Sequence, residues 1–334
     1  QGEVPVEITV TSGQRPEPTV QIRADLTNAD LVLEAIAWRK PPGRSAFLQF
    51  EIAEGKTHKR ELQNFRVAGD SIAIEGWAAL GADNRLKEFF FTDFSLNVVT
   101  RLEVQGKLGA DNVWSIKARG PTFDGRDFFR SLFSVGQVTD KPVKPLKPRE
   151  GIDLDAAIDN VIGFSEVSLR GLKMKMQRRG ERLTSLDARG TLDGGKPLAA
   201  VLDPKAAGPR KLRADSTDAG QAFRLTGFYP NIQNGRVRLE VNLDGSGPAE
   251  KTGTLWVEDF RILGDAVVTE VFGGVEETKG QGGKRERKVV RQAFDFDIMR
   301  VPFSVGHGQF AMDNSSLKGP LIGAHMRGKV DYKT

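Results

Sequence analysis

Histidine, acidic pairs and clustered glycines are the residues of this chain whose types could support catalysis or metal binding. The three histidines, His58, His307 and His325, each lie far in the sequence from any plausible partner. A zinc site generally needs three or four ligands at close spacing, so we expect a structural or surface role for each histidine. The chain has no cysteine, which excludes disulfides, thiol catalysis and cysteine metal sites. We therefore expect no metal.

Two pairs of acidic residues have a spacing that acid–base chemistry could use. Asp153 and Asp155 are separated by one apolar residue, and so are Asp295 and Asp297. On a β-strand this spacing places both carboxylates on the same face. We interpret both pairs as acids that face water, because the apolar residue between them would then point to the core.

Glycine-rich segments could form phosphate-binding loops. The glycines at positions 273, 274, 280, 282 and 283 do not follow a strand and open a helix, so they lack the context that a phosphate loop requires. The nucleophile motif Gly-x-Ser-x-Gly is also absent. The sequence offers no catalytic residue, and we expect a protein that is not an enzyme and uses no cofactor.

The basic residues are concentrated in two stretches of a chain whose formal net charge is +5. Residues 141–149 (KPVKPLKPR) interleave Lys with Pro, which predicts an extended, solvated linker. Residues 284–291 (KRERKVVR) follow a Gly-rich segment and indicate a loop that leads into a strand. Neither stretch is interleaved with the aromatic residues that stack on bases, so we expect no nucleic-acid partner.

The composition is typical of a soluble globular protein with one large or two ordinary domains. Of the 334 residues 39% are hydrophobic and 28% are charged. No stretch approaches the roughly 18 consecutive apolar residues that a bilayer crossing requires. The first residues, QGEVPVEITVTS, lack the basic leader and apolar run of a signal peptide, and we interpret the chain as a piece of a longer protein.

Alternation of apolar and polar residues recurs along most of the chain and predicts β-strands. The alternating segments are residues 6–10, 20–26, 48–52, 94–104, 114–118, 172–176, 186–192, 223–225, 237–243 and 294–298. Turn signals between them include GADN at 109–112, DGG at 193–195 and Asn-Gly at 234–235. We expect a mainly β fold built as a long antiparallel meander.

Two segments have the pattern of short amphipathic helices. Residues 124–133 (DGRDFFRSLF) and 265–272 (DAVVTEVF) each gather apolar side chains on one face, and Asp265 stands at an N-cap position. We expect each helix to cover an end or edge of the sheet. Residues 29–38 could also form a helix, but Leu31 and Leu33 alternate and KPPG follows closely, so we predict a strand and a turn.

The Pro- and Lys-rich stretch is the best candidate for a domain boundary. We divide the chain into an N-terminal β lobe that ends in a short helix (1–137), a linker (138–151) and a C-terminal β lobe (152–334). Each lobe would hold several strands and one short helix. No internal repeat is strong enough to indicate a duplication.

Several longer strings resemble one known family. They are IDLDAAIDNVIGF (152–164), LRGLKMKMQRRGERLTSLDARGTLDGG (169–195), DAG (218–220), GFYPNIQNGRVRLEVNL (227–243) and GTLWVEDFRILGDAVV (253–268). They resemble the C-terminal region of the AsmA-like family, and in particular the YhdP-type bacterial envelope proteins. In the N-terminal lobe, residues 24–43 and 118–133 resemble the preceding part of the same family.

The resemblance implies a β-sheet curled into an open trough with an apolar interior, in a periplasmic protein involved in moving phospholipid between the inner and outer membranes. It implies an anchor in the inner membrane through an N-terminal helix that this chain lacks. The partners would be phospholipid acyl chains, the two membranes and an envelope protein. The shared motifs are structural, so no catalytic residue carries over.

A sheet with one apolar face could cover acyl chains, whose exposure to water costs roughly 0.8 kcal/mol per methylene. Methionines in such a lining would adapt to varied chains. The residues that we expect to line it are Val98, Leu102, Val104, Leu172, Met174, Met176, Leu239, Val241, Phe294 and Phe296.

Three other interpretations remain open. The same alternation is typical of a closed β-sandwich whose inner faces pack on each other. The residue patterns alone favour this sandwich over a trough. The chain could also be a structural or docking module that pairs its β edges with a partner. A hydrolase or carbohydrate-binding sandwich would need a cluster of acids and exposed aromatic residues, which the four Trp and two Tyr do not visibly supply.

Overall fold

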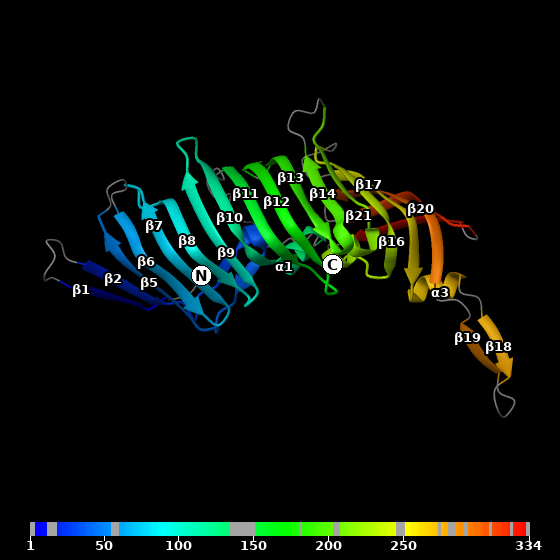
Figure 1. Cartoon of the computed structure of the whole chain (residues 1–334), viewed down its shortest axis with the longest axis horizontal. Helices are drawn as coiled ribbons and strands as arrows, with labels where there is room; N and C mark the ends of the chain where they lie inside the picture. Colours follow the sequence, from blue (N-terminus) through cyan, green and yellow to red (C-terminus); the bar gives the residue numbers. More distant parts are fainter. Residues whose placement is uncertain are drawn as a thin grey trace. The chain divides into compact units, whose positions relative to one another are not determined.

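The fold is mainly β, with 70% of it in strands. The computed structural model describes residues 4–11, 19–54, 60–133, 151–180, 182–202, 208–244, 251–272, 275–279, 285–289, 293–306, 309–320 and 323–331. Within these residues, 18 strands belong to one mixed sheet that does not close, and two ribbons of two strands each and three short helices accompany it (Figure 1). The mainly β prediction is confirmed.

The chain divides into two compact units, which are described separately. The first comprises Gln1–Ser131, Val143–Ile162 and Arg170–Ala188, and the second comprises Leu132–Pro142, Gly163–Leu169 and Arg189–Thr334. Of the linker predicted at 138–151, residues 138–150 lie outside the described residues. The strand at 151–162, which we assigned to the C-terminal lobe, pairs with a strand of the first unit.

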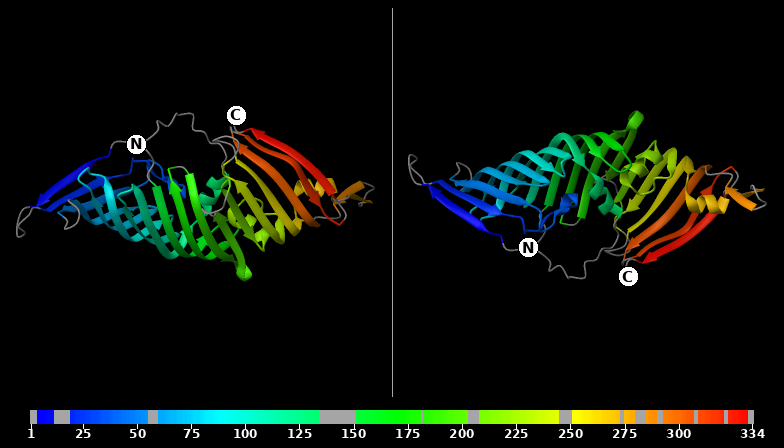
Figure 2. Two further views of the ribbon diagram at one scale, coloured as in Figure 1. Left: turned by 90° about the horizontal axis from the view of Figure 1, so that it is seen from above. Right: turned by 90° about the horizontal axis from the view of Figure 1, so that it is seen from below.

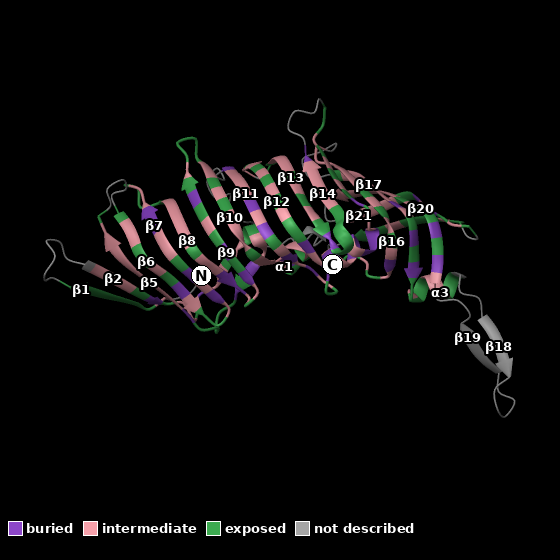
Figure 3. Ribbon diagram, in the orientation of Figure 1, coloured by how far each residue is buried: buried purple, intermediate pink, exposed green. Residues whose placement is uncertain are grey.

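The strands of the first unit follow one another across the sheet nearly in chain order (Figures 1 and 2). They are β1 (Val6–Thr11), β2 (Thr19–Asp25), β5 (Ala46–Ala53), β6 (Arg60–Gly69), β7 (Ile72–Leu80), β8 (Leu86–Leu96), β9 (Thr100–Leu108), β10 (Val113–Asp124) and β11 (Gly151–Ile162). The strands β12 (Ser168–Arg179) and β13 (Arg182–Leu192) come next in the chain. Along these strands buried and half-buried residues alternate with exposed ones (Figure 3).

One strand pair departs from the predicted antiparallel meander. β10 and β11 are parallel, with Trp114 opposite Ile152 and Ile116 opposite Leu154. A parallel pair needs a long crossover connection, and residues 125–150 separate the two strands in the sequence. The predicted Phe-rich helix forms there as α1 (Arg126–Phe133), so its place in the chain is that of a crossover helix.

A hairpin inserted between β2 and β5 forms a small core on the sheet. Its strands are β3 (Leu31–Leu33) and β4 (Trp38–Lys40), joined by a 3-10 turn at Glu34–Ile36, which confirms the strand and turn predicted for this segment. The indole Nε1 of Trp38 donates to Oδ1 of Asn97 at 3.0 Å. The buried residues of this core are Trp38, Ala46, Val67, Ile72, Ile74 and Leu96.

The second unit continues as antiparallel strands with two helices. The strands are β14 (Lys196–Leu202), β15 (Lys211–Ser216), β16 (Ile232–Asn242), β17 (Lys251–Leu263), β20 (Ala293–Gly306), β21 (Gln309–Lys318) and β22 (Gly323–Asp331). A separate ribbon pairs β18 (Val275–Lys279) with β19 (Arg285–Val289). The described part of the basic stretch 284–291 is therefore itself a strand. The glycines at 273, 274, 280, 282 and 283 lie outside the described residues.

The helices of the second unit are α2 (Ala219–Thr226) and α3 (Ala266–Phe272). The α3 prediction is confirmed, and its N-cap Asp265 accepts a hydrogen bond from the backbone N–H of Val268 at 2.8 Å. The strand predicted at 223–225 is wrong, because these residues belong to α2. Asp218 caps α2 by accepting from the N–H of Gln221 at 2.9 Å, and Gly227 ends it with φ of 70°.

Two further local predictions are wrong. Residues 94–104 were expected to form one strand, but β8 ends at Leu96, and Asn97 and Val98 take left-handed φ values of 51° and 63° in a turn before β9. Asn234 and Gly235 were expected in a hairpin but lie inside β16, with φ values of 58° and 80°. The register with β17 is the same on both sides of them, with Asn234 opposite Phe260 and Arg236 opposite Glu258.

Candidate functional site

Apolar residues on one face of the first unit stand opposite each other across successive strands, so they form rows across the sheet. One row is Val10, Val20, Ile52, Leu62, Ala78, Phe89, Gly106, Ile116 and Leu154. A second row is Val6, Ala24, Leu48, Val67, Ile74, Phe94 and Leu102. Between them, Phe91, Val104, Ala118 and Ala156 form part of a third row. The alternation seen in the sequence is thus in register over nine strands.

The hairpin β3–β4 covers part of this face. Val67, Ile74 and Leu96 are buried in the core that it forms, and Leu48, Phe65, Phe91 and Phe94 pack against that core. The larger residues of the other two rows are half-buried, or exposed on β1. One margin of the face is therefore a closed core, and the remainder is an apolar surface.

A chain of aromatic rings crosses the half-buried part of this face. The ring centroids are 6.4 Å apart for Phe50 and Phe65, 5.4 Å for Phe65 and Phe91, 4.9 Å for Phe91 and Phe89, and 5.6 Å for Phe89 and Trp114. Together these rings reach from β5 to β10. We name this set the aromatic row. The sequence analysis missed it, although the run of three phenylalanines at 89–91 was a signal for it.

A glycine makes room for one ring of the aromatic row. A Cβ atom placed on Gly106 would lie 2.4 Å from the Cε1 and Cζ atoms of Phe89, which is the cross-strand partner of Gly106. The second unit has a similar glycine–phenylalanine pair, because a Cβ on Gly253 would lie 2.4 Å from Cζ of its cross-strand partner Phe303. In each pair the phenylalanine ring lies over the neighbouring strand.

The apolar face of the second unit is also closed over one part. Helix α2 contributes Ala219 and Phe223 to a buried core with residues of four strands. Those strand residues are Ile232, Val257, Phe260, Ile262, Phe294, Phe296 and Leu317. On β15, β16, β17 and β20, half-buried residues continue this face. They are Leu212, Ala214, Leu239, Val241, Leu255, Val301 and Phe303.

The residues predicted to line a lipid site fall into three groups. Val104, Leu172, Met174, Met176, Leu239 and Val241 are half-buried strand residues that alternate with polar neighbours. Leu102 is buried at 9% exposure in the second row. Phe294 and Phe296 are 1% and 2% exposed inside the core under α2, and Val98 is 74% exposed in the β8–β9 turn. These last three cannot line an open apolar surface, and we correct their assignment.

The opposite face of the sheet is charged and crossed by ion pairs. Arg66 pairs with Glu75 at 3.1 Å and Arg213 with Glu240 at 3.3 Å, each between neighbouring strands. The acidic pairs from the sequence lie on this face. Asp153 binds Arg179 at 2.6 Å, Asp155 binds Arg119 at 2.7 Å, and Asp295 binds Arg261 at 2.7 Å. These carboxylates are bound by arginines in partly exposed pairs, which is how solvated charges are usually arranged.

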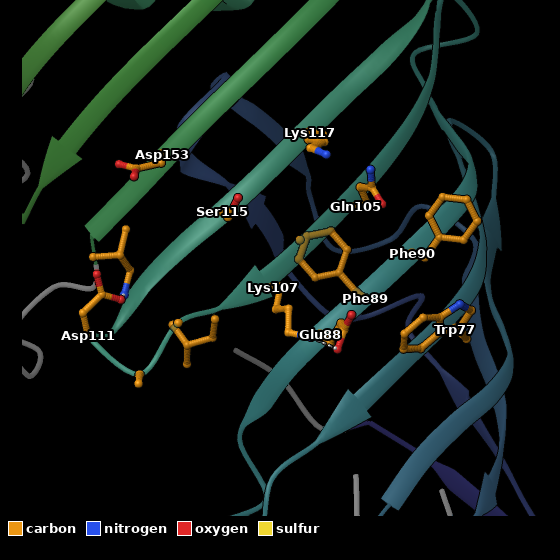
Figure 4. Close-up of a pocket in the computed structure, with 15 residues that line it drawn as sticks. Trp77, Glu88, Phe89, Phe90, Gln105, Lys107, Asp111, Ser115, Lys117 and Asp153 are labelled. Atoms are coloured by element: carbon orange, nitrogen blue, oxygen red, sulfur yellow. Dashed lines mark hydrogen bonds and ion pairs between the residues drawn. The ribbon is translucent and has the colours of Figure 1, made fainter. Parts of the chain in front are cut away.

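A shallow depression of about 730 Å³ lies on the charged face of the first unit (Figure 4). Trp77 and Phe90 lie at one end of it, and Asp153 lies at the other. Lys107 and Glu88 form an ion pair of 3.2 Å between these ends. Its polar lining residues lie on the face opposite the aromatic row, and Phe89 of that row also lines it.

The most strongly perturbed titrating pair lies at the start of α3. The hydroxyl of Tyr229 donates to Oδ2 of Asp265 at 2.5 Å. Burial, and then the hydrogen bond to Asp265, raise the pKa of Tyr229. The same hydrogen bond, together with the N–H of Val268, lowers the pKa of Asp265. Since this pair also caps a helix, its role is structural.

Among the described residues, no group of three or more His, Asp or Glu side chains is placed to hold a metal ion. His325 lies exposed on β22, while His58 and His307 lie outside the described residues. In the parts of the chain that the structure describes, no helix has the length and hydropathy needed to cross a bilayer.

Neither protein-family models, nor curated proteins, nor solved structures give a match to this chain. The geometry described above is therefore the basis for a functional proposal. Its main feature is an apolar sheet face that is only partly closed in each unit.

Proposed function

We propose that this chain is a non-enzymatic lipid-conducting segment of a bacterial envelope protein, in which the apolar sheet faces hold phospholipid acyl chains. The observation that carries the proposal is that the apolar rows belong to one unclosed sheet and stay half-buried over much of their length. Acyl chains lying on these rows would be shielded from water, at a gain of roughly 0.8 kcal/mol per methylene.

The absence of a large second sheet favours this proposal over the sandwich. A sandwich needs two sheets of comparable size to bury each other's apolar faces. Within the described residues, the strands outside the single sheet form only the ribbons β3–β4 and β18–β19. The β3–β4 hairpin and α2 each close a part of an apolar face, and the rest is left for a ligand.

The chemistry of the half-buried rows suits hydrocarbon. The aromatic row offers flat apolar area, and Met174 and Met176 offer flexible thioethers that adapt to chains of different shape. With the family resemblance, we place the protein in the periplasm, held at the inner membrane and exchanging lipid with the outer membrane. Phospholipid would move by diffusion along the apolar face, with no cofactor.

Site-specific photocrosslinking tests the proposal with matched controls. A photoreactive residue at Val104 or Leu239 should capture phospholipid when the protein is made in bacteria, and native mass spectrometry should detect co-purified phospholipid. The controls are Glu103 and Arg238, exposed residues that neighbour these positions and point to the charged face. Equal labelling at all four positions, or protein that is consistently free of lipid, would overturn the proposal.

A docking module is a second candidate function, and strand β1 favours it. β1 pairs with β2, and all six of its residues are exposed. Val6, Ile8 and Val10 are 54%, 62% and 62% exposed. Exposed apolar edge strands recruit further strands, so this edge would suit an envelope protein that adds a strand to the sheet.

A further inference from the structure

The depression on the charged face of the first unit has a lining that differs from the rest of that face. Two sets of cross-strand neighbours from β7 to β11 line it. The first set is Trp77, Phe90, Gln105 and Lys117. The second set is Glu88, Lys107, Ser115 and Asp153. The lining therefore places two aromatic rings beside a group of polar side chains.

The two aromatic residues stand directly opposite each other on neighbouring strands. Trp77 on β7 is the register partner of Phe90 on β8, and both are half-buried. They point away from the face that carries Phe89 and Phe91, so they do not belong to the aromatic row. Large aromatic side chains on a wet face, with polar groups around them, are typical of binding surfaces.

The charges around the depression balance one another. Lys107 is paired with Glu88 at 3.2 Å, and Asp153 is paired with Arg179 at 2.6 Å. Lys117 and the turn residue Asp111 add one further charge of each sign. A site with this balance does not select a strongly charged ligand.

Several hydrogen-bonding groups at the depression have no protein partner in the described ranges. Nε1 of Trp77, the amide of Gln105, the hydroxyl of Ser115 and the ammonium of Lys117 make no hydrogen bond or ion pair there. Together they offer donors and acceptors on the strands β7, β9 and β10. A ligand rich in hydroxyl groups can use donors and acceptors at once.

We propose that this depression binds a neutral oligosaccharide of about two or three sugar rings, as the size of the depression allows. The apolar C–H faces of one sugar stack on Trp77 and Phe90. The hydroxyls of the next sugar exchange hydrogen bonds with Gln105, Ser115 and Lys117.

Saturation-transfer NMR on the intact chain tests the proposal with defined probes. The probes are maltotriose, cellotriose and triacetylchitotriose, with trigalacturonate as the charged comparison. We expect at least one neutral trisaccharide to bind, with its ring C–H protons receiving the strongest saturation. Trp77→Ala should weaken binding about tenfold or more, as loss of an aromatic stacking surface does elsewhere. Gln105→Ala, at an exposed position, should weaken it several-fold.

The matched control for Trp77 is Trp256 in the second unit, which is also half-buried. Its cross-strand neighbours are the charged-face residues Arg238 and Arg300. Trp256→Ala should leave binding unchanged. Thermal melts establish whether each variant is folded. If Trp77→Ala is not folded, Gln105→Ala still tests the site. Absence of binding by every neutral probe, tighter binding of trigalacturonate, or affinity unchanged in both site variants would overturn the proposal.

Discussion

At the scale of single residues, side chains on the apolar face have two different roles. Phe296 and Phe294 are sealed in a core, whereas Phe89 and Phe91 are half-buried in the aromatic row. Both kinds follow the same alternating pattern in the sequence. The first pair belongs to a core that also contains Ala219 and Phe223 of α2, whereas the second pair stays partly exposed.

The sealed phenylalanines should contribute more to stability than the aromatic row. Phe296→Ala should lower the free energy of unfolding by about 3–5 kcal/mol, because it leaves a cavity in a packed core. Phe91→Ala should cost less, since its ring is already partly in contact with solvent. Chemical denaturation of both variants measures the difference. Equal costs would contradict the distinction between core and surface.

Gly106 should be intolerant of a side chain because of Phe89. Gly106→Ala should destabilise the protein by about 1–3 kcal/mol, since the added Cβ would overlap the ring. Gly323→Ala is the matched strand control, because its Cβ would meet only the carbonyl oxygen of Leu317 at 3.9 Å.

A double-mutant cycle identifies the cause. In the Phe89→Ala background, Gly106→Ala should cost much less than it does in the native protein. The free energies of unfolding of the four proteins give this coupling. A cost that is the same in both backgrounds would rule out the ring as the source of the strain.

At the scale of elements, short insertions decide which parts of the sheet are closed. The β3–β4 hairpin closes part of one face in the first unit, and α2 does so in the second. Each is held by specific bonds. The hairpin is tied by Nζ of the buried Lys40, which donates to the carbonyls of Thr27, Pro41 and Arg44 at 3.1, 3.2 and 3.0 Å.

The cap of α3 should be sensitive to acid. The folded protein lowers the pKa of Asp265 below 3.8, through hydrogen bonds from Tyr229 and Val268. A lowered folded-state pKa contributes stability that is present above the unfolded pKa and is lost as pH falls through the folded value. Asp265→Asn keeps a capping side chain but loses the charge that accepts from Tyr229, so it should be less stable than the native protein at pH 7 by about 1 kcal/mol, the difference between a charge-assisted and a neutral hydrogen bond.

Unfolding of the two proteins at a series of pH values checks this dependence. The difference in stability between them should shrink as pH falls below about 4, the ordinary pKa at which the aspartate of the unfolded chain is protonated, toward the lower pKa of Asp265 in the folded protein. Asp297→Asn is the control, because Asp297 is an exposed acid outside this cap. A difference between Asp265→Asn and the native protein that stays constant down to pH 2 would contradict the role of the carboxylate.

At the scale of the whole molecule, the sheet does not close and therefore has edge strands. The edge strand β1 carries exposed apolar side chains. Native proteins usually protect such edges with charge, bulges or a covering segment. In β1 the only charged residue is Glu7. The edge is therefore the surface at which we expect the chain to associate with other strands.

Charging this edge should suppress association. Ile8→Lys and Val10→Lys should reduce self-association and strand-mediated capture of envelope proteins, because lysine on an edge disfavours strand addition. Light scattering and pull-down from envelope extracts measure the two effects. Lys329→Glu on the opposite-terminal strand β22 is a control for altered charge alone. Association that is unchanged in the β1 variants would remove the support for a docking function.

Much of the fold could be predicted from the sequence, because strand formation and facing are local properties. The alternation at Val6, Leu48, Met174 and Leu239 identified strands, and the apolar faces of α1 and α3 identified helices. The errors occurred in short segments whose residue pattern fits more than one structure. Residues 223–225 alternate as a strand would, but the capping residues on either side make them part of a helix. Val98 continues the apolar alternation of β8, but it lies in a tight turn.

The sequence by itself determined which residues are apolar, where most strands run and that the two faces of the sheet differ, since these depend on residue type and a period of two. Only the tertiary structure decided that the strands join one unclosed sheet with a parallel pair at β10–β11. It also decided that Phe296 is sealed while Val104 stays half-buried, and that Trp77 meets Phe90. These outcomes depend on register and on which distant segment covers a face, and neither is encoded in the pattern of a single strand.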